Sequence, residues 1–376
     1  MSKFFFLALL ALTQAACSTP YHPPQFLDPN TVFPGLIDIA AQSQGKAIDV
    51  LLVHGICNHD ERWARDTVAQ LTQALTVNAP PAGVQPRAGA AAQIQVVPLP
   101  VDTSAGRLRF DALVWSPLTQ SLKSQLCYDM GDKNGLCQGS PPMPYQRARF
   151  NARAKDYLID DCVADALIYE GASHDTMVER MRAAVLQVLD RGDAPADVPL
   201  VVVSESMGSK YLFDTLLSMS KEDAGSRAAQ VAQRTMDRMR YLVMAANQIP
   251  LLGLADQHID AALPGRVANG AAMPPGSDSL QQLLQMRRAR AGVGAGAADQ
   301  RLVLVAFTDP SDLLSYTLQT EKYAGAGIAA YNILVSNAST YLGLFERPDD
   351  AHLNYLSNPD VGRLVACGQP VSKLCK

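Results

Sequence analysis

The chain reads PLVVVSESMGS over residues 199–209, and this stretch decides the fold. Its apolar, β-branched first half is typical of a buried strand, whereas residues 210–219 follow a helical pattern. A strand that turns sharply into a helix holds the residue between them in a strained backbone conformation, so only small residues fit beside it. Ser206 occupies that position, and Ser204 and Gly208 are its small flanking residues. We therefore predict that Ser206 is a nucleophile.

Short apolar runs alternate with helical patterns along the rest of the chain. Strands are expected at residues 47–53, 94–99, 113–115, 200–203, 241–245, 302–307 and 331–335. Helices are expected at residues 60–75, 152–169, 177–189, 208–219 and 224–239. This alternation predicts the α/β fold class, in which a mostly parallel sheet is covered by helices on both faces.

Two segments of the predicted folded domain, residues 46–376, depart from this alternation. Residues 122–145 are rich in Gly, Pro and polar residues, and residues 254–301 include a Gly/Ala tract at 291–297. We expect both segments to be insertions over the carboxyl edge of the sheet. Long loops at that edge are often lids or binding loops, and a plain surface excursion is the alternative.

The N-terminal residues 1–17 have the features of a secretory signal. Lys3 precedes an apolar stretch at residues 4–12, and small residues follow that stretch. The apolar stretch is too short to span a bilayer in the mature protein. Residues 18–45 are expected to form an extended tether because they are rich in proline. The prolines in question are Pro20, Pro23, Pro24 and Pro29.

The residues before Cys17 resemble the processing site of bacterial lipoproteins. Cleavage directly after Ala15 and Ala16 leaves this cysteine as an acylated N-terminus in such proteins. The resemblance implies an exported protein of the periplasm or the outer membrane, attached to the membrane by a lipid anchor on Cys17. Gln14 stands where these proteins usually have Leu, so ordinary secretion with cleavage near Ala16 is the alternative.

The six other cysteines are an even number, which in an exported chain predicts disulfides. The sequence does not fix their pairing, although Cys127 with Cys137 and Cys367 with Cys375 are close enough to close small loops. No CxxC spacing occurs and the histidines do not cluster with the cysteines, so we expect no metal site. Three acids in the helical segment 152–169 are interpreted as one face of a helix rather than as metal ligands. They are Asp160, Asp161 and Asp165.

The charge of the chain argues against a nucleic-acid partner. Among 376 residues the formal net charge is −4, and no long basic run occurs. Binding to phosphate backbones needs clustered Lys and Arg. Hydrophobic residues make up 48% of the chain, which is enough to bury the core of one large α/β domain with insertions.

A serine hydroxyl needs an imidazole to take its proton and a carboxylate to fix the tautomer of that imidazole. Of six histidines, only His352 lies after every predicted strand. It belongs to the polar stretch 348–355, which we expect to be a loop that brings the imidazole over the sheet edge. We therefore predict that His352 is the base for Ser206.

The acid is expected after the strand at residues 302–307, where two carboxylates follow. Asp309 precedes Pro310 and suits a turn or a helix cap, whereas Asp312 lies deeper in the loop, where side chains can turn inward. We predict Asp312 as the acid and keep Asp309 as the alternative.

The chain order Ser206, Asp312, His352 resembles the α/β-hydrolase superfamily, and within it the serine esterases and lipases. A His-Gly pair at residues 54 and 55, after an early strand, belongs to the same resemblance. It implies a serine hydrolase that cleaves carboxylic esters through an acyl-enzyme without a cofactor. The implied substrate is a small-molecule or lipid ester.

The resemblance also implies an oxyanion hole. In that superfamily the residue after the nucleophile supplies one backbone N–H, and the His-Gly turn supplies the other. The matching residues are Met207 and either Ile56 or Gly55. Alternatives are an acyltransferase or peptidase with the same three residues, and a non-catalytic lipoprotein that uses the fold to hold a ligand.

Overall fold

The structure is a computed structural model, and it describes residues 21–77, 93–131, 135–141, 144–190, 198–257, 277–291 and 301–376. The predicted signal segment, residues 1–17, and the lipidation candidate Cys17 lie outside the described residues. So do residues 258–276 and 292–300 of the predicted insertion 254–301.

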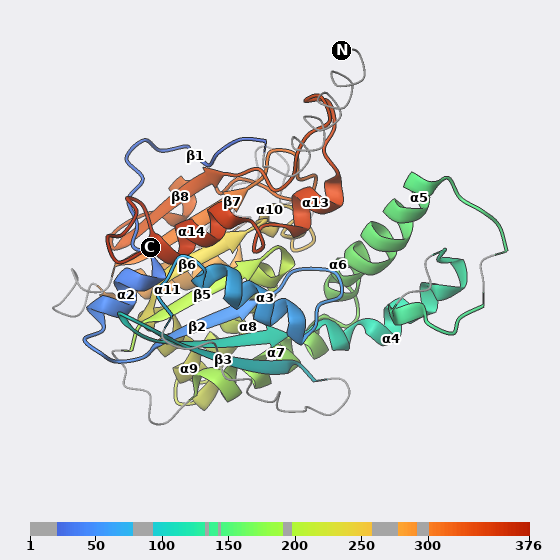
Figure 1. Cartoon of the computed structure of the whole chain (residues 1–376). Coiled ribbons are helices and arrows are strands. Elements are labelled where there is room, and N and C mark those ends of the chain that lie inside the picture. Colours follow the sequence, from blue (N-terminus) through green and yellow to red (C-terminus); the bar gives the residue numbers. More distant parts are fainter. Residues whose placement is uncertain are drawn as a thin grey trace, which may run out of the picture.

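A sheet in the strand order β1-β8-β7-β6-β5-β2-β4-β3 runs through the middle of the molecule (Figure 1). Strands β4, β2, β5, β6, β7 and β8 are parallel, and β3 and β1 join the two edges antiparallel. The strands are β1 (Gln25–Phe26), β2 (Ile48–Val53), β3 (Gln95–Thr103), β4 (Gly106–Val114), β5 (Leu200–Glu205), β6 (Met239–Ala245), β7 (Leu302–Thr308) and β8 (Ile328–Leu334). The predicted α/β class with a mostly parallel sheet is confirmed.

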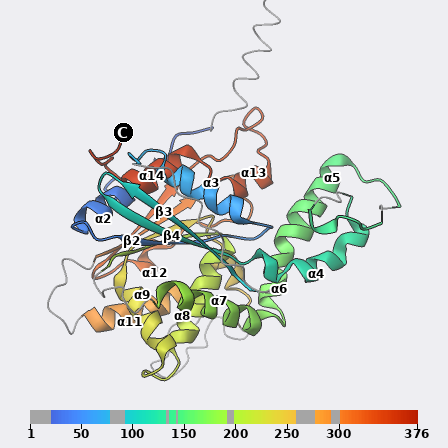
Figure 2. The same ribbon diagram turned by 60° about the horizontal axis from the view of Figure 1, so that its bottom comes forward.

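Helices cover both faces of the sheet, as Figures 1 and 2 show. One face carries α7 (His174–Leu189), α8 (Met207–Ser220), α9 (Arg227–Arg238) and α11 (Ser279–Ala291). The other carries α2 (Leu36–Gln42), α3 (Glu61–Thr72) and α14 (Pro359–Cys367). Strand β5 sends alternate side chains into the two resulting cores. Burial on both faces explains why its sequence is a continuous apolar run rather than an alternating one.

A helical unit follows the carboxyl end of β4 and projects from the sheet domain in both views (Figures 1 and 2). It contains η1 (Ser116–Leu118), α4 (Gln120–Lys123), η2 (Ser124–Asp129), η3 (Gly135–Cys137), α5 (Arg149–Arg153), the π-helical η4 (Ala154–Val163) and α6 (Ala164–Glu170). The predicted insertion at 122–145 is therefore part of a longer unit. The helix predicted at 152–169 is three consecutive helical segments.

The tether predicted at residues 18–45 is wrong for residues 21–45. Strand β1 pairs with the edge strand β8, and α2 buries Leu36, Ile37 and Ile39 in the core. Proline favours extended chain locally, but these apolar side chains gain more from burial than an extended tether would allow.

The second predicted insertion also differs in its described part. Helix α11 does not lie over the sheet edge, because Leu280, Leu283 and Leu284 are buried in the core against α8 and α9. Their spacing of three and four residues is that of a helix face packed on a core. Three further short helices complete the described chain: α10 (Ile249–Leu252), α12 (Thr320–Tyr323) and α13 (Pro348–Leu353).

The six cysteines form three disulfides. Cys127 pairs with Cys137 and Cys367 pairs with Cys375, closing the two small loops that the spacing allows. The third pair, Cys57 with Cys162, joins residues 105 positions apart and ties the segment after β2 to η4. Among the helices of the described ranges, none combines the length and apolar character needed to cross a bilayer.

Candidate active site

The turn between β5 and α8 has the strained geometry that the sequence predicts. Ser206 adopts φ 54° and ψ −132°, and its N–H donates to the carbonyl of Ala245 at 2.7 Å. A Cβ on Gly208 would lie 2.3 Å from the carbonyl oxygen of His54. Glycine is therefore required there for α8 to approach the end of β2 this closely.

The structure brings the three predicted catalytic residues together from the segments after β5, β7 and β8. The Ser206 hydroxyl lies 3.1 Å from Nε2 of His352, and Nδ1 of His352 lies 2.9 Å and 3.0 Å from the two oxygens of Asp312. Since Nδ1 donates to the carboxylate, Nε2 is free to accept the serine proton. All three side chains are buried.

His352 lies on helix α13 and not in the loop that the polar sequence predicts. Pro348 occupies the first turn of this helix, where a missing N–H is harmless, and Asp349 and Asp350 lie near its positive end. The polar residues around His352 therefore stabilise a short helix. That helix fixes the imidazole more firmly than a loop would.

Asp312 has the contacts expected of an ionised partner. Its carboxylate accepts hydrogen bonds from the N–H of Leu314 at 2.9 Å and from the hydroxyl of Tyr355 at 3.0 Å, besides that of His352. Burial alone would raise its pKa, but the hydrogen bond and charge of His352, with these two donors, hold the pKa of Asp312 below its ordinary value.

Asp309, the alternative acid, is committed to the backbone. Its carboxylate accepts the N–H of Ser311 at 2.8 Å and the N–H of Asn337 at 2.6 Å. Burial raises its pKa above the ordinary value. Asp309 therefore ties the loop after β7 to the loop after β8. It does not orient the imidazole.

The predicted oxyanion-hole residues lie against Ser206. A Cβ on Gly55 would lie 2.6 Å from Cβ of Ser206, so the backbone after β2 passes directly over the serine. Met207 is the first residue of α8, whose positive dipole end points at the same place. In the described parts of the chain the N–H groups of Ile56 and Met207 meet no acceptor. Both remain available to an oxyanion.

His54 holds this loop in shape. Its Nε2 accepts the N–H of Trp115 at 2.8 Å, and its Nδ1 donates to the carbonyl of Gly55 at 2.7 Å. Burial lowers the pKa of His54 well below its ordinary value, so the ring stays neutral and keeps this tautomer. Its geometry gives His54 a structural role.

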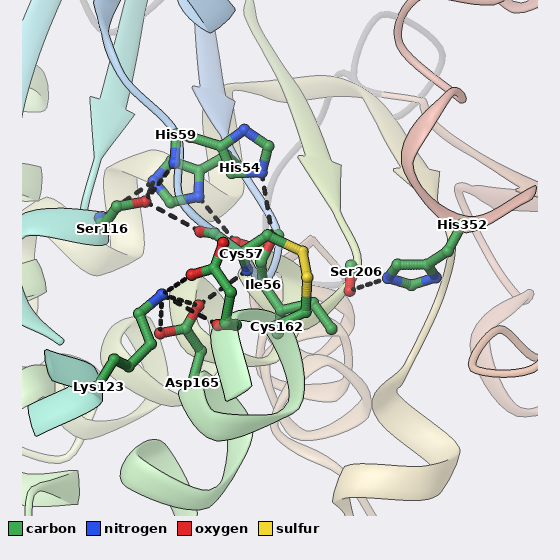
Figure 3. The surroundings of a disulfide bond; sticks show 12 residues. His54, Ile56, Cys57, His59, Ser116, Lys123, Cys162, Asp165, Ser206 and His352 are labelled. Atoms are coloured by element: carbon green, nitrogen blue, oxygen red, sulfur yellow. Dashed lines mark hydrogen bonds and ion pairs between the residues drawn. A yellow bond between two sulfur atoms is a disulfide. The ribbon is translucent and has the colours of Figure 1, made fainter. Parts of the chain in front are cut away.

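A second set of contacts fixes the loop at Cys57, as Figure 3 shows. Its backbone has a φ of 81°, its N–H donates to Asp165 at 2.8 Å, and its sulfur is bonded to Cys162. The ammonium of Lys123 lies 3.1 Å from Asp165 and 2.7 Å from Asp161. Lys123 and Asp165 approach the loop from one side, while Ser206 and His352 lie on the other (Figure 3).

These residues were not recognised from the sequence as part of the site. Asp165, interpreted as one face of a helix, is buried next to the loop, and burial raises its pKa to about 6 despite the ammonium of Lys123. The only indication in the sequence is that Cys162 and Asp165 both lie in the predicted helix 152–169. The fold brings this segment to the end of β2.

Glu205, beside Ser206, is the other unexpected group. It is buried, and its carboxylate accepts hydrogen bonds from the N–H of Gly55 and the indole of Trp63. Burial raises the pKa of Glu205 to about 8, with a further contribution from the negative charge of Asp312. At neutral pH the protonated form of Glu205 therefore predominates beneath the loop after β2.

No protein-family model matches the sequence, and a search of curated proteins likewise finds no match. Across the described ranges, no cluster of three or more His, Cys, Asp or Glu side chains has the arrangement of a metal site. The function of the protein is therefore inferred from the geometry of Ser206, His352 and Asp312.

Proposed function

We propose that this protein is a serine hydrolase of the α/β-hydrolase superfamily that cleaves carboxylic esters through an acyl-enzyme. The observation that carries the proposal is the hydrogen-bonded series from Ser206 through His352 to Asp312, with Ser206 on a strained strand-to-helix turn. The chain order of the three residues supports the superfamily assignment.

In the first half of the reaction, His352 takes the proton of Ser206 through Nε2 while the serine oxygen attacks the ester carbonyl. The N–H groups of Ile56 and Met207 stabilise the negative oxygen of the tetrahedral intermediate. Collapse of this intermediate breaks the ester bond, and the alcohol leaves with the proton from His352. Asp312 remains ionised and stabilises the imidazolium.

In the second half, water replaces the alcohol. His352 takes a proton from the water, whose oxygen attacks the acyl carbon, and the same two N–H groups hold the second oxyanion. The acid then leaves and Ser206 regains its proton. The cycle thus uses three side chains and two backbone N–H groups of the protein, with water as the second substrate.

A fluorophosphonate probe tests the nucleophile. We expect it to label the wild-type protein and not Ser206→Ala, and we expect a p-nitrophenyl ester series to report the acyl preference. A wild type that stays unlabelled would support the ligand-binding alternative. Faster transfer to an added alcohol than to water would support an acyltransferase, and cleavage of peptides alone a peptidase.

The two candidate acids can be separated by matched substitutions. We expect Asp312→Asn to lower kcat by about 10⁴-fold, because the amide favours the wrong imidazole tautomer. Asp309→Asn should lower kcat far less, since it disturbs only the loops after β7 and β8. Circular dichroism and thermal melts control for folding, and the reverse ranking would assign the acid to Asp309.

The lipoprotein assignment is part of the same proposal. Three disulfides are compatible with an oxidising, exported location, and Cys17 follows a signal-like segment. We expect Cys17→Ala to move the protein from the membrane fraction to the soluble fraction of the cell. Unchanged membrane association would contradict the lipid anchor.

A further inference from the structure

Two leucines at the tip of a hairpin between β8 and α13 have no role in the folded core. Leu342 is 95% exposed and Leu344 is 87% exposed. The hairpin is closed by a hydrogen bond from the N–H of Tyr341 to the carbonyl of Phe345 at 2.7 Å, and Gly343 supports the tight turn with a φ of 70°. A built turn that presents apolar side chains to solvent marks a contact surface.

The apolar surface continues behind the hairpin. The exposed ring of Phe150 packs edge-on against Phe345 at a centroid distance of 6.1 Å. Between the hairpin and helices α5 and η4 lies a cavity of about 290 Å³, with Tyr157 and Leu158 among its lining residues. The hairpin and Phe150 thus form one aromatic and aliphatic surface.

The hairpin belongs to the same short segment of the chain as the proposed base, His352. Residues 335–345 carry no charge, and helix α13 with His352 begins three residues after Phe345. The ion pair of Arg153 with Asp349, at 2.6 Å, fastens α5 to α13 beside the cavity. Whatever the hairpin contacts therefore lies close to the candidate active site.

The start of the described chain lies at the same place. The N–H of Tyr21 donates to the Ser336 hydroxyl at 2.8 Å, and a Cβ on Gly343 would lie 3.5 Å from the Tyr21 hydroxyl. Cys17 precedes Tyr21 by four residues, which span at most about 14 Å when fully extended. A lipid anchor on Cys17 would therefore hold a bilayer at the hairpin.

We propose that the docking hairpin, residues 341–345, inserts Leu342 and Leu344 into the surface of a phospholipid bilayer. The rings of Tyr341, Phe345 and Phe150 then lie at the level of the lipid headgroups, where aromatic side chains are favoured. Docking in this way places the candidate active site next to lipid esters, a substrate class that rests on the proposed function.

A tryptophan placed on the hairpin tests this directly. The chain has two tryptophans, Trp63 and Trp115, and neither belongs to the hairpin. We expect Leu342→Trp emission to shift to the blue on adding phosphatidylcholine vesicles and to be quenched by brominated phosphatidylcholine. Leu374→Trp is the matched control, because Leu374 is exposed near the C-terminus, which lies away from the hairpin in both views (Figures 1 and 2).

The two variants can be compared even if a lipid anchor on Cys17 also binds the vesicles. Brominated lipid quenches only a tryptophan that lies within the bilayer. Equal quenching of both variants, or none in either, would overturn the proposal. So would a blue shift of the Leu342→Trp variant that grows with protein concentration without lipid, because it would assign the surface to a second copy.

The docking test is independent of the proposed chemistry. In a Ser206→Ala background the quenching should persist, so a failure of the esterase proposal leaves this result intact. In the active protein, a Leu342→Glu and Leu344→Glu double variant should lower hydrolysis of a vesicle-borne ester by roughly 100-fold. Its hydrolysis of soluble p-nitrophenyl acetate should equal that of the wild type. An equal loss on both substrates would overturn the docking role.

Discussion

The loop after β2, residues 54–59, and the docking hairpin differ in what holds them. Both follow the carboxyl ends of parallel strands, and both contain a residue other than glycine at positive φ, Cys57 and Leu342. The β2 loop is fixed by a disulfide, a buried carboxylate and a buried histidine. The hairpin is closed by its own backbone and leaves its leucines in water.

The difference indicates two kinds of function. A loop whose strained backbone is fixed from several sides suits chemistry, because an oxyanion hole must hold its N–H groups in place before the reaction. A hairpin that presents two almost fully exposed leucines suits binding, because those side chains gain free energy only when another apolar phase covers them.

The largest effect is expected from the disulfide of the β2 loop. Replacing Cys57 and Cys162 by Ser frees a loop of 105 residues in the unfolded chain, which corresponds to about 5 kcal/mol of stability. Replacing Cys127 and Cys137, 10 residues apart, corresponds to about 3 kcal/mol. Only the first pair should also lower kcat, because Cys57 adjoins Ile56.

Denaturant unfolding and turnover of a p-nitrophenyl ester measure the two effects separately. If both disulfide variants lose the same stability and keep the same kcat, the β2 loop is no more constrained by its disulfide than a surface loop. The contrast with the hairpin would then lose its main support.

A methyl group on the β2 loop is expected to have the next largest effect. Gly55→Ala puts a Cβ 2.6 Å from Cβ of Ser206 and 3.1 Å from the carbonyl oxygen of Glu205, so the loop must move away from Ser206. Loss of one oxyanion donor lowers kcat by about 10²- to 10³-fold. Gly225→Ala is the control, because a Cβ there meets nothing within 4 Å.

The test is steady-state kinetics on a soluble ester, with thermal melts to confirm folding. A Gly55→Ala protein that folds and turns over at the rate of Gly225→Ala would show that the loop adapts. Such a result would mean that N–H groups outside the β2 loop stabilise the oxyanion.

Glu205, buried beneath the β2 loop, is expected to make the stability of the folded protein depend on pH. Its pKa is about 8 in the folded protein, against an ordinary value of 4.5, so between these pH values the folded state keeps a proton that the unfolded state has lost. Wild-type stability should therefore fall as pH rises from about 4.5 to about 8. Glu205→Gln removes this dependence.

Thermal melts across that range measure the difference. The Tm of Glu205→Gln minus that of the wild type should grow with pH and level off above about 8. Glu179→Gln, which alters an exposed carboxylate on α7, should give a constant difference. A constant difference for Glu205→Gln as well would mean that its carboxyl is not buried in the neutral form.

Much of the candidate site could be predicted from the sequence because its signals are local. The β-branched run, the small residues around Ser206 and the order of Asp312 and His352 all lie within short stretches or follow strand ends. The strand–turn–helix geometry at residue 206 then follows from backbone sterics.

The contacts that fix the β2 loop could not be predicted in this way. Cys57 meets Cys162, and Lys123 meets Asp165, only after the helical unit folds back onto the end of β2. Neither pair has a sequence pattern of its own. The sequence predicts only the end of strand β4, because Arg109 interrupts the apolar run. In the structure the guanidinium of Arg109 is paired with Asp49 in the neighbouring strand β2.

The smallest effect on the free energy of unfolding is expected from substitutions in the docking hairpin. Leu342→Glu with Leu344→Glu should change the free energy of unfolding by no more than about 0.5 kcal/mol, since both side chains are exposed in the folded and unfolded states. Ile56→Ala, at a buried position of the β2 loop, should cost about 2 to 5 kcal/mol. A hairpin variant that destabilises as much as Ile56→Ala would show that the leucines serve the fold. If the wild type and the hairpin variant are equally stable, the two leucines at the tip do not serve the fold. A partner outside the chain then accounts for them.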